Sequence, residues 1–238
     1  MSTMQELREQ VWRCTMELPK LGLVVHTFGN VSAIDRTKGL VAIKPSGVPY
    51  DELQPSDIVV VDLENTVVEG KLRPSSDTKT HTHLYRAFPG IGGVVHTHST
   101  HAVAWAQAMK PIPILGTTHA DFVAEDIPCT AVMTDAMIRG DYEEETGTQI
   151  VRAFRKRSYE DVPMVLVAGH GPFTWGTTPE QAVYHSQMLE EIARMALMTV
   201  AINPSVPRLK KKLIEKHYFR KHGPGSYYGQ DNKQRRAR

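Results

Sequence analysis

The chain has little of what marks a secreted, membrane-spanning or polyanion-binding protein. Its 238 residues include only two cysteines, Cys14 and Cys129, which lie far apart, so we predict neither a disulfide framework nor a Cys-x-x-Cys metal site. No apolar run is long enough to span a bilayer, and residues 1–10 do not have the apolar core of a signal peptide. The formal net charge of +2 indicates no strong preference for nucleic acid. We therefore expect a cytoplasmic protein with no membrane or nucleic-acid partner.

No linker, internal repeat or low-complexity segment divides the chain. We expect one α/β domain over residues 1–230, followed by a basic, disordered tail at 231–238. Apolar spacing and capping residues predict helices near 4–18, 78–88, 100–109, 146–157 and 179–202. Strand-like segments are 23–27, 41–43, 58–62, 66–69, 94–98 and 165–168. Because the early strands cluster, a mixed or antiparallel sheet covered by helices is favoured over a doubly wound parallel one.

Two histidines one residue apart follow an apolar segment that ends at Val95. Alternate side chains of a strand share a face, so His96 and His98 can bind one ion. A second apolar segment, 165–168, leads to His170. Three imidazoles at strand ends, with a fourth position left open, are typical of a catalytic zinc site. Taken alone, His170 would be interpreted as a buried core histidine.

The same His-x-His pattern occurs at His81 and His83. These residues fall in the helix expected near 78–88. Residues two apart on a helix do not face each other, so we do not expect this copy to chelate a metal.

Three polar loops contain the residue types that bind anions. Glycine allows close approach of the backbone to a ligand, and serine hydroxyls and backbone amides donate to phosphate oxygens. The loop residues are Gly29, Asn30, Ser46, Gly47, Ser75 and Ser76. Each loop is also consistent with an ordinary turn, since turns use the same residues.

Several segments occur together in one order along the chain: 29–33, 43–47, 73–78, 95–99, 116–121, 170–173, 216–218 and 227–230. In this combination the chain resembles the L-ribulose-5-phosphate 4-epimerases of the class II aldolase and adducin-head superfamily. The resemblance covers nearly the whole chain. It implies a three-layer αβα sandwich and a homotetramer with active sites between neighbouring subunits.

The resemblance also implies roles for individual residues. Zinc would be bound by His96, His98 and His170, with Asp77 as a further metal-site residue. Related aldolases have a glutamate base where this chain has Asp77, which favours an epimerase over a lyase.

Other roles follow from the same resemblance. Asp121 and Tyr228 would be the paired proton donor and acceptor, reaching the site across the subunit boundary, and His217 would lie close to that site. Contacts to the substrate and its phosphate would come from Gly29, Asn30, Lys44, Ser46, Gly47, Ser75 and Ser76.

The implied reaction interconverts L-ribulose 5-phosphate and D-xylulose 5-phosphate. The C2 carbonyl does not activate the C4 hydrogen, whereas cleavage and re-formation of the C3–C4 bond can invert C4. The C4 oxygen must then lose a proton on one face and gain one on the other, which requires two acid–base groups. The alternatives are a class II sugar-phosphate aldolase or dehydratase, or a non-catalytic, adducin-like association module.

Overall fold

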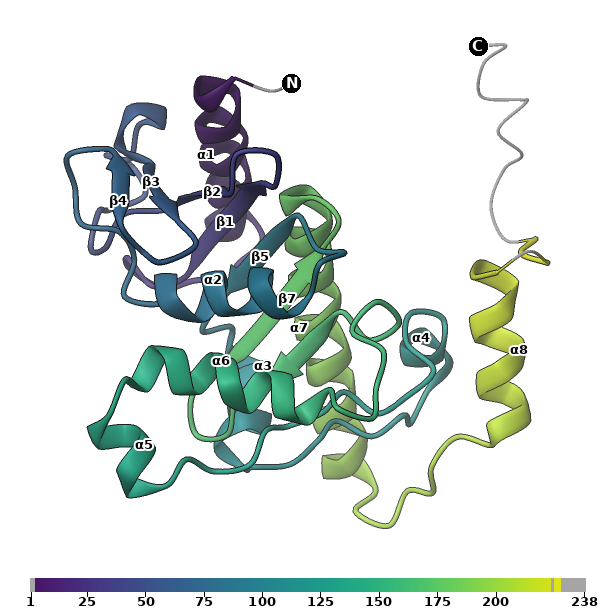
Figure 1. Cartoon of the computed structure of the whole chain (residues 1–238). Helices are drawn as coiled ribbons and strands as arrows, with labels where there is room; N and C mark the ends of the chain where they lie inside the picture. Colours follow the sequence, from purple (N-terminus) through teal and green to yellow (C-terminus); the bar gives the residue numbers. More distant parts are fainter. Residues whose placement is uncertain (1–2, 224, 228–238) are drawn as a thin grey trace, which may run out of the picture.

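A seven-stranded sheet lies at the centre of the computed structural model, which describes residues 3–223 and 225–227 (Figure 1). The strand order is β4-β3-β2-β1-β5-β7-β6, and every neighbouring pair is antiparallel. The strands are β1 (Asn30–Asp35), β2 (Leu40–Ile43), β3 (Val59–Asp62), β4 (Val67–Glu69), β5 (Gly93–His96), β6 (Met164–Leu166) and β7 (Pro172–Gly176). The α/β class is confirmed, and the sheet is antiparallel rather than mixed.

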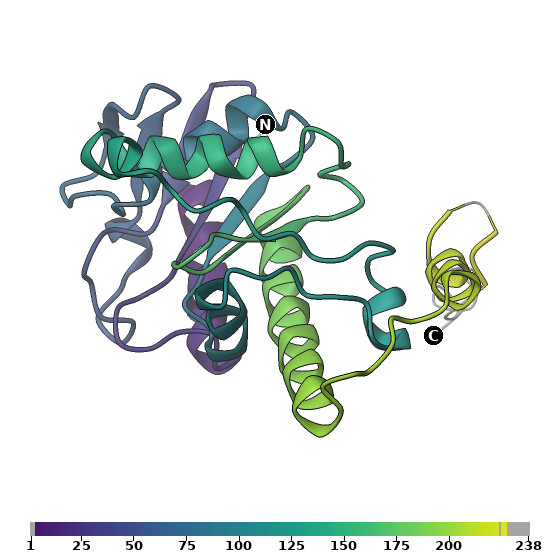
Figure 2. The ribbon, with the colours of Figure 1, turned by 90° about the horizontal axis from the view of Figure 1, so that it is seen from below.

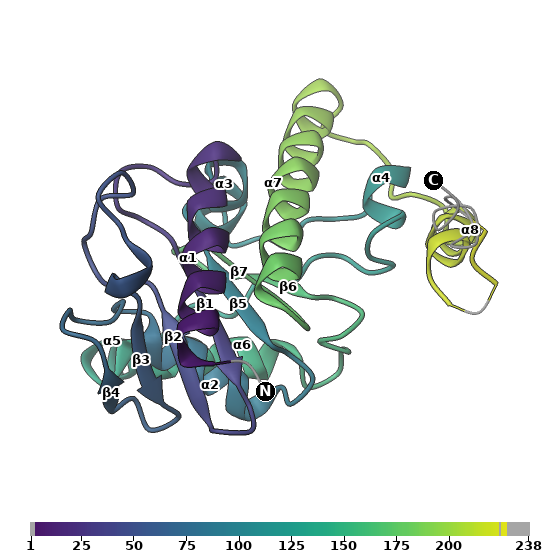
Figure 3. The same ribbon diagram turned by 90° about the horizontal axis from the view of Figure 1, so that it is seen from above.

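Helices lie on both faces of this sheet (Figures 2 and 3). One face is covered by α1 (Met4–Lys20), α3 (Thr100–Gln107) and α7 (Pro179–Ile202). On the other face lie α2 (Thr78–Ala87), α5 (Asp135–Arg139) and α6 (Tyr142–Ala153). This arrangement agrees with the helix, sheet and helix layers that the resemblance implies.

Strand alternation supplies an apolar surface to each layer. Val31 and Val95 are buried with residues of α1 and α7, whereas Val94 belongs to the larger core cluster together with Leu84 of α2. Ser32, the residue after Val31, points to the α2 side, where its hydroxyl contacts α2 side chains. Both faces of the central strands are buried, and a slip by one residue would turn every side chain of a strand to the opposite face. Burial on both sides therefore fixes the register of these strands.

The predicted strand at 23–27 is wrong. His26 has φ 53°, in the left-handed region that does not continue a strand, and the first strand begins at Asn30 instead. The short helices α4 (Thr117–Ala120) and α5, helix α8 (Lys211–Lys221) and strand β7 were also not predicted. Helix α8 packs against α4, away from the central sheet (Figure 1).

The register brings three chain segments together at one end of the sheet. Asn30 at the start of β1 pairs with His96 at the end of β5, and His96 pairs with Phe173 at the start of β7. Residues just outside these strand ends therefore converge on one place. None of the helices that the structure describes has both the length and the apolar character needed to cross a membrane.

Candidate functional site

Three histidines meet at this end of the sheet. His96 ends β5, His98 lies just beyond it, and His170 lies in the turn before β7. One ligand atom from each lies within 4.8 Å of those of the other two. The structure thus brings together the three imidazoles predicted to bind a metal, although β5 ends at His96 and does not reach His98 as predicted.

A backbone carbonyl orients the His96 ring. The Nδ1 atom lies 2.9 Å from the carbonyl oxygen of Pro172, which can only accept a hydrogen bond, so Nδ1 carries the proton. The lone pair is therefore on Nε2, which lies 4.0 Å from Oδ2 of Asp77. The ring also stacks on Phe173 with 4.2 Å between centroids. Metal-binding histidines are commonly held in this way through their second nitrogen.

His98 and His170 are mostly neutral at pH 7, because the pKa of each lies below its ordinary value. Burial, followed by the neighbouring His96, lowers the pKa of His98 and brings the pKa of His170 to about 4. A neutral imidazole has a lone pair to offer, and metal binding requires this form.

Asp77 supplies a carboxylate to the same place. It precedes α2, where an aspartate usually caps the helix, but its side chain makes no capping hydrogen bond. Instead, its Oδ2 accepts a hydrogen bond of 2.7 Å from Nδ2 of Asn30. Burial acts to raise the pKa of Asp77, but the imidazoles of His96 and His81 and this hydrogen bond hold it below its usual value. The three imidazoles form a donor set that fits a divalent metal ion such as zinc, and the Asp77 carboxylate lies beside them.

The histidines form one wall of a cavity of about 330 Å³. The polar loops form the remainder, and every loop residue predicted to contact substrate or phosphate lines this cavity. His217, which was predicted to lie close to the site, does not line it. The lining residues include Gly29, Asn30, Lys44, Ser46, Gly47, Ser75, Ser76, Asp77, His96, His98 and His170.

Backbone hydrogen bonds hold two of the loops side by side. The amide of Ser46 donates to the carbonyl of Arg73 over 3.0 Å, and the amide of Ser75 donates to that of Lys44 over 3.1 Å. The third loop turns at Gly29, with φ 84°, where an added Cβ would lie 2.5 Å from Cγ1 of Val24. A side chain does not fit there, so glycine is required.

Lys44 places a positive charge beside these loops. Only 1% of the residue is exposed, and Nζ donates to the carbonyls of Thr27, Pro45 and Val48 over 3.2 to 3.4 Å. Among the residues that the structure describes, no carboxylate forms an ion pair with Lys44. Burial lowers its pKa to about 8, so it remains mostly protonated at pH 7. A buried cation without a carboxylate partner, next to serine hydroxyls, favours an anion in this part of the cavity.

Asp121 and His217 lie elsewhere in the chain, near α4 and α8. Asp121 accepts hydrogen bonds from Nε and Nη2 of Arg220 over 2.8 and 2.6 Å, and it lies 2.9 Å from Nδ1 of His217. Neither residue lines the histidine cavity of its own chain. Tyr228 and the predicted tail at 231–238 lie outside the described residues. The assignment of Asp121 and Tyr228 to a neighbouring subunit's site stays a prediction.

Sequence reasoning did not identify two aromatic neighbours of the cluster. Phe28 lies against His98 with 5.5 Å between ring centroids. The hydroxyl of Tyr142, the first residue of α6, lies 3.4 Å from Nδ1 of His170. Asp141 caps the N-terminus of α6, so an aspartate at this place could have indicated that the helix begins at Tyr142.

Comparisons with known proteins agree with this geometry. Residues 9–197 match the class II aldolase and adducin N-terminal domain family. An L-fuculose 1-phosphate aldolase has 25% sequence identity and a TM-score of 0.78, covering 92% of this chain and 97% of its own. L-fuculose-1-phosphate aldolase from Thermus thermophilus has 28% identity and a TM-score of 0.65, with 85% and 98% covered. YgbL from Klebsiella pneumoniae, at 23% identity and a TM-score of 0.70 with 91% and 99% covered, shares the fold.

Buried His81 predicts a pH dependence of stability. Burial lowers its pKa from 6.5 to about 3, and its Nδ1 pairs with the Ser32 hydroxyl over 2.7 Å. Because unfolding restores the ordinary pKa, the unfolded chain binds the proton first. The contribution of neutral His81 to the free energy of unfolding is complete above pH 6.5. It is lost as the pH falls from 6.5 towards 3, by up to about 1.4 kcal/mol per pH unit. Urea unfolding of metal-free protein from pH 7 to 5 measures this slope.

The matched variant is His81→Gln, which keeps a polar side chain without the titrating group. We expect it to be less stable at pH 7 but to have a shallower pH slope. An unchanged slope would contradict this origin of the pH dependence.

Proposed function

The chain belongs to the class II aldolase and adducin N-terminal domain family, and from this membership we propose a metal-dependent enzyme that cleaves and re-forms a carbon–carbon bond in a sugar phosphate. The specific reaction we propose is epimerisation at C4 between L-ribulose 5-phosphate and D-xylulose 5-phosphate. One observation carries the proposal: the metal donors and the anion-binding loops line the same cavity. Similar solved structures include proteins named as sugar-phosphate aldolases.

We assign the metal ligands to His96, His98 and His170, with Asp77 beside them, and zinc as the ion. A divalent ion bound there would act as a Lewis acid on the oxygens of the sugar. The protein's contribution is orientation. Pro172 fixes the His96 ring, Asn30 fixes the Asp77 carboxylate, and the neutral rings keep their lone pairs available.

The phosphate group would occupy the end of the cavity formed by the paired loops. Lys44 supplies the positive charge, and the exposed hydroxyls of Ser46 and Ser76 supply donors. Ser75 is buried, and its Oγ accepts hydrogen bonds from Asn30 and from the amide of Asp77. Ser75 therefore joins the phosphate loop to the metal side of the cavity.

Proton transfer is assigned to Asp121 and Tyr228 of a neighbouring subunit. Burial acts to raise the pKa of Asp121, but hydrogen bonds from Arg220 and His217 hold it below its usual value. Asp121 is therefore ionised and fits the role of proton acceptor. A tyrosine hydroxyl then fits the role of donor on the opposite face of the substrate.

Two observations favour the epimerase over its nearest alternative, an aldolase that releases the aldehyde. Asp77 is one methylene shorter than glutamate, so its carboxylate reaches less far into the cavity. Asn30 also holds that carboxylate at 2.7 Å, turned towards the histidines. Similarity to proteins named as L-fuculose 1-phosphate aldolases keeps the aldolase as the second candidate. The three convergent imidazoles argue against a purely structural, adducin-like module.

We further propose one catalytic domain over residues 1–230, a cytoplasmic location and a cyclic homotetramer. In a closed ring, each boundary between subunits can carry the same composite site.

A product assay tests the reaction. Purified protein supplied with L-ribulose 5-phosphate should form D-xylulose 5-phosphate, without accumulating glycolaldehyde phosphate, and should contain one divalent ion per chain. His98→Asn should lose both metal and activity while its far-UV circular dichroism is unchanged. Stoichiometric release of the aldehyde would instead identify an aldolase, and full turnover by chelator-treated His98→Asn would refute the metal site.

Ser46→Ala tests the phosphate end of the cavity. Loss of one hydrogen bond to a charged group costs about 1.5–3 kcal/mol, or about ten- to 150-fold in kcat/KM. We expect this loss with L-ribulose 5-phosphate and little change with unphosphorylated L-ribulose. An equal loss on both substrates would show that Ser46 does not bind the phosphate. Ser46 is a better choice than Ser75, whose hydroxyl also contacts Asn30.

Complementation tests the shared site. His98→Asn and Asp121→Asn should each be nearly inactive alone. When the two variants are mixed, dissociated and reassembled, random pairing should restore about a quarter of wild-type activity, because a quarter of the boundaries combine two intact halves. Mixed oligomers that are no more active than their parents would place the metal and Asp121 in one chain.

A further inference from the structure

We infer that Tyr142 is a positioning residue for the metal ligand His170, an inference that rests on the proposed metal site. The Tyr142 hydroxyl lies 3.4 Å from Nδ1 of His170. If the hydroxyl accepts the Nδ1 proton, Nε2 keeps its lone pair for a metal. Tyr142 is not among the residues that line the cavity, and its hydroxyl contacts His170, so we place its effect on this ring.

His170 needs such a partner more than His96 does. His96 lies within a strand, and a backbone carbonyl holds its ring. His170 lies in the turn between β6 and β7, next to Gly169 with φ 71°. Among the described residues, Tyr142 is the one hydrogen-bond partner of its imidazole. The orientation of this ring therefore depends on where α6 places Tyr142.

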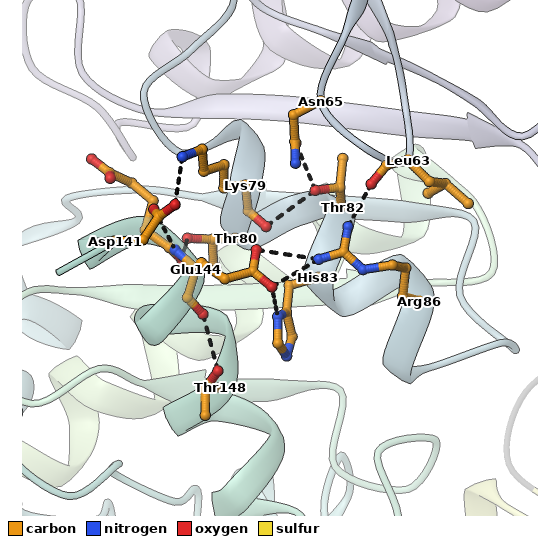
Figure 4. Close-up of polar contacts among 11 residues, drawn as sticks. Leu63, Asn65, Lys79, Thr80, Thr82, His83, Arg86, Asp141, Glu144 and Thr148 are labelled. Carbon is orange, nitrogen blue, oxygen red and sulfur yellow. Dashed lines mark hydrogen bonds and ion pairs between the residues drawn. The ribbon is translucent and has the colours of Figure 1, made fainter. Parts of the chain in front are cut away.

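Polar contacts between α2 and α6 fix the first turn of α6 (Figure 4). On one side, Lys79 forms an ion pair with Asp141. On the other, His83 and Arg86 both contact the Glu144 carboxylate, at 2.6 and 2.9 Å. These contacts flank Tyr142 in the sequence.

Two further contacts bring the helices close together. The Thr80 hydroxyl donates to the carbonyl of Glu143 over 2.7 Å. At Gly147, an added Cβ would lie 2.7 Å from Cβ of His83, so the His83 side chain packs directly on the backbone of α6. Exposed ion pairs contribute little to stability. Here they fix the position of α6 relative to α2. Because α2 begins directly after Asp77, one helix pair carries both Asp77 and Tyr142.

Hydrogen-bond partners of metal-binding histidines orient the ring and raise its basicity, and their loss typically costs about 10–100-fold in metal affinity or activity. The test variant is Tyr142→Phe, which keeps the ring and removes the hydroxyl. We expect it to bind Zn²⁺ about 10–100-fold more weakly in competition with a chromophoric chelator. The Co²⁺-loaded variant should also show a changed absorption spectrum, which reports ligand geometry.

The matched control is Tyr159→Phe. The Tyr159 hydroxyl also takes part in a hydrogen bond, which it accepts from the amide of Gly90, but it lies outside the cavity lining. We expect this variant to be slightly less stable and to bind Zn²⁺ as the wild type does. Unfolding of the metal-free proteins shows that both variants are folded.

A double-mutant cycle identifies the route of the effect. If Tyr142 acts through His170, then Tyr142→Phe should weaken Zn²⁺ binding in the wild-type background and not in a His170→Ala background. Equal weakening in both backgrounds, or unchanged affinity of Tyr142→Phe, would overturn the inference and leave the metal site intact. Absence of Zn²⁺ binding by the wild type would overturn the proposed metal site and this inference with it.

Discussion

The hydrogen bond between the His96 ring and the carbonyl of Pro172 is the contact on which the site depends. It joins the end of β5 to the start of β7 and selects the His96 tautomer. Since His98 follows His96 by two residues and His170 precedes Pro172 by two, this one contact places both near the same point. The register of the sheet then adds Asn30, which faces His96 on β1 and holds Asp77.

The buried charges of the cavity reduce the stability of the ligand-free protein and favour the binding of a ligand. A lysine that is 1% exposed and a mostly buried carboxylate are costly to bury, and bound ligands can offset that cost. Both charges line one cavity, with Lys44 beside the serine loops and Asp77 close to His96. Clusters of groups with perturbed pKa values are typical of functional sites.

A mixed or antiparallel sheet and the clustering of His96, His98 and His170 could be predicted from the sequence because their signals are local, such as the two-residue spacing of His96 and His98. Tyr142 could not be found in this way, because it meets His170 only through the packing of α6 on α2. Helix α6 was expected near 146–157 but spans Tyr142–Ala153. Its first turn is acidic rather than apolar, which stabilises a helix N-terminus through the helix dipole. Apolar spacing alone therefore starts this helix one turn late and leaves Tyr142 in a loop.

The position of α8 separates two halves of the proposed chemistry within one chain. Metal and phosphate donors gather at one end of the sheet, whereas Asp121 is held by Arg220 and His217 beside α4. Helix α8 packs on α4 and not on the sheet (Figure 1). A second copy of the chain that presents its α4 and α8 to the cavity would complete the site, so the proposed catalysis requires assembly as well as folding.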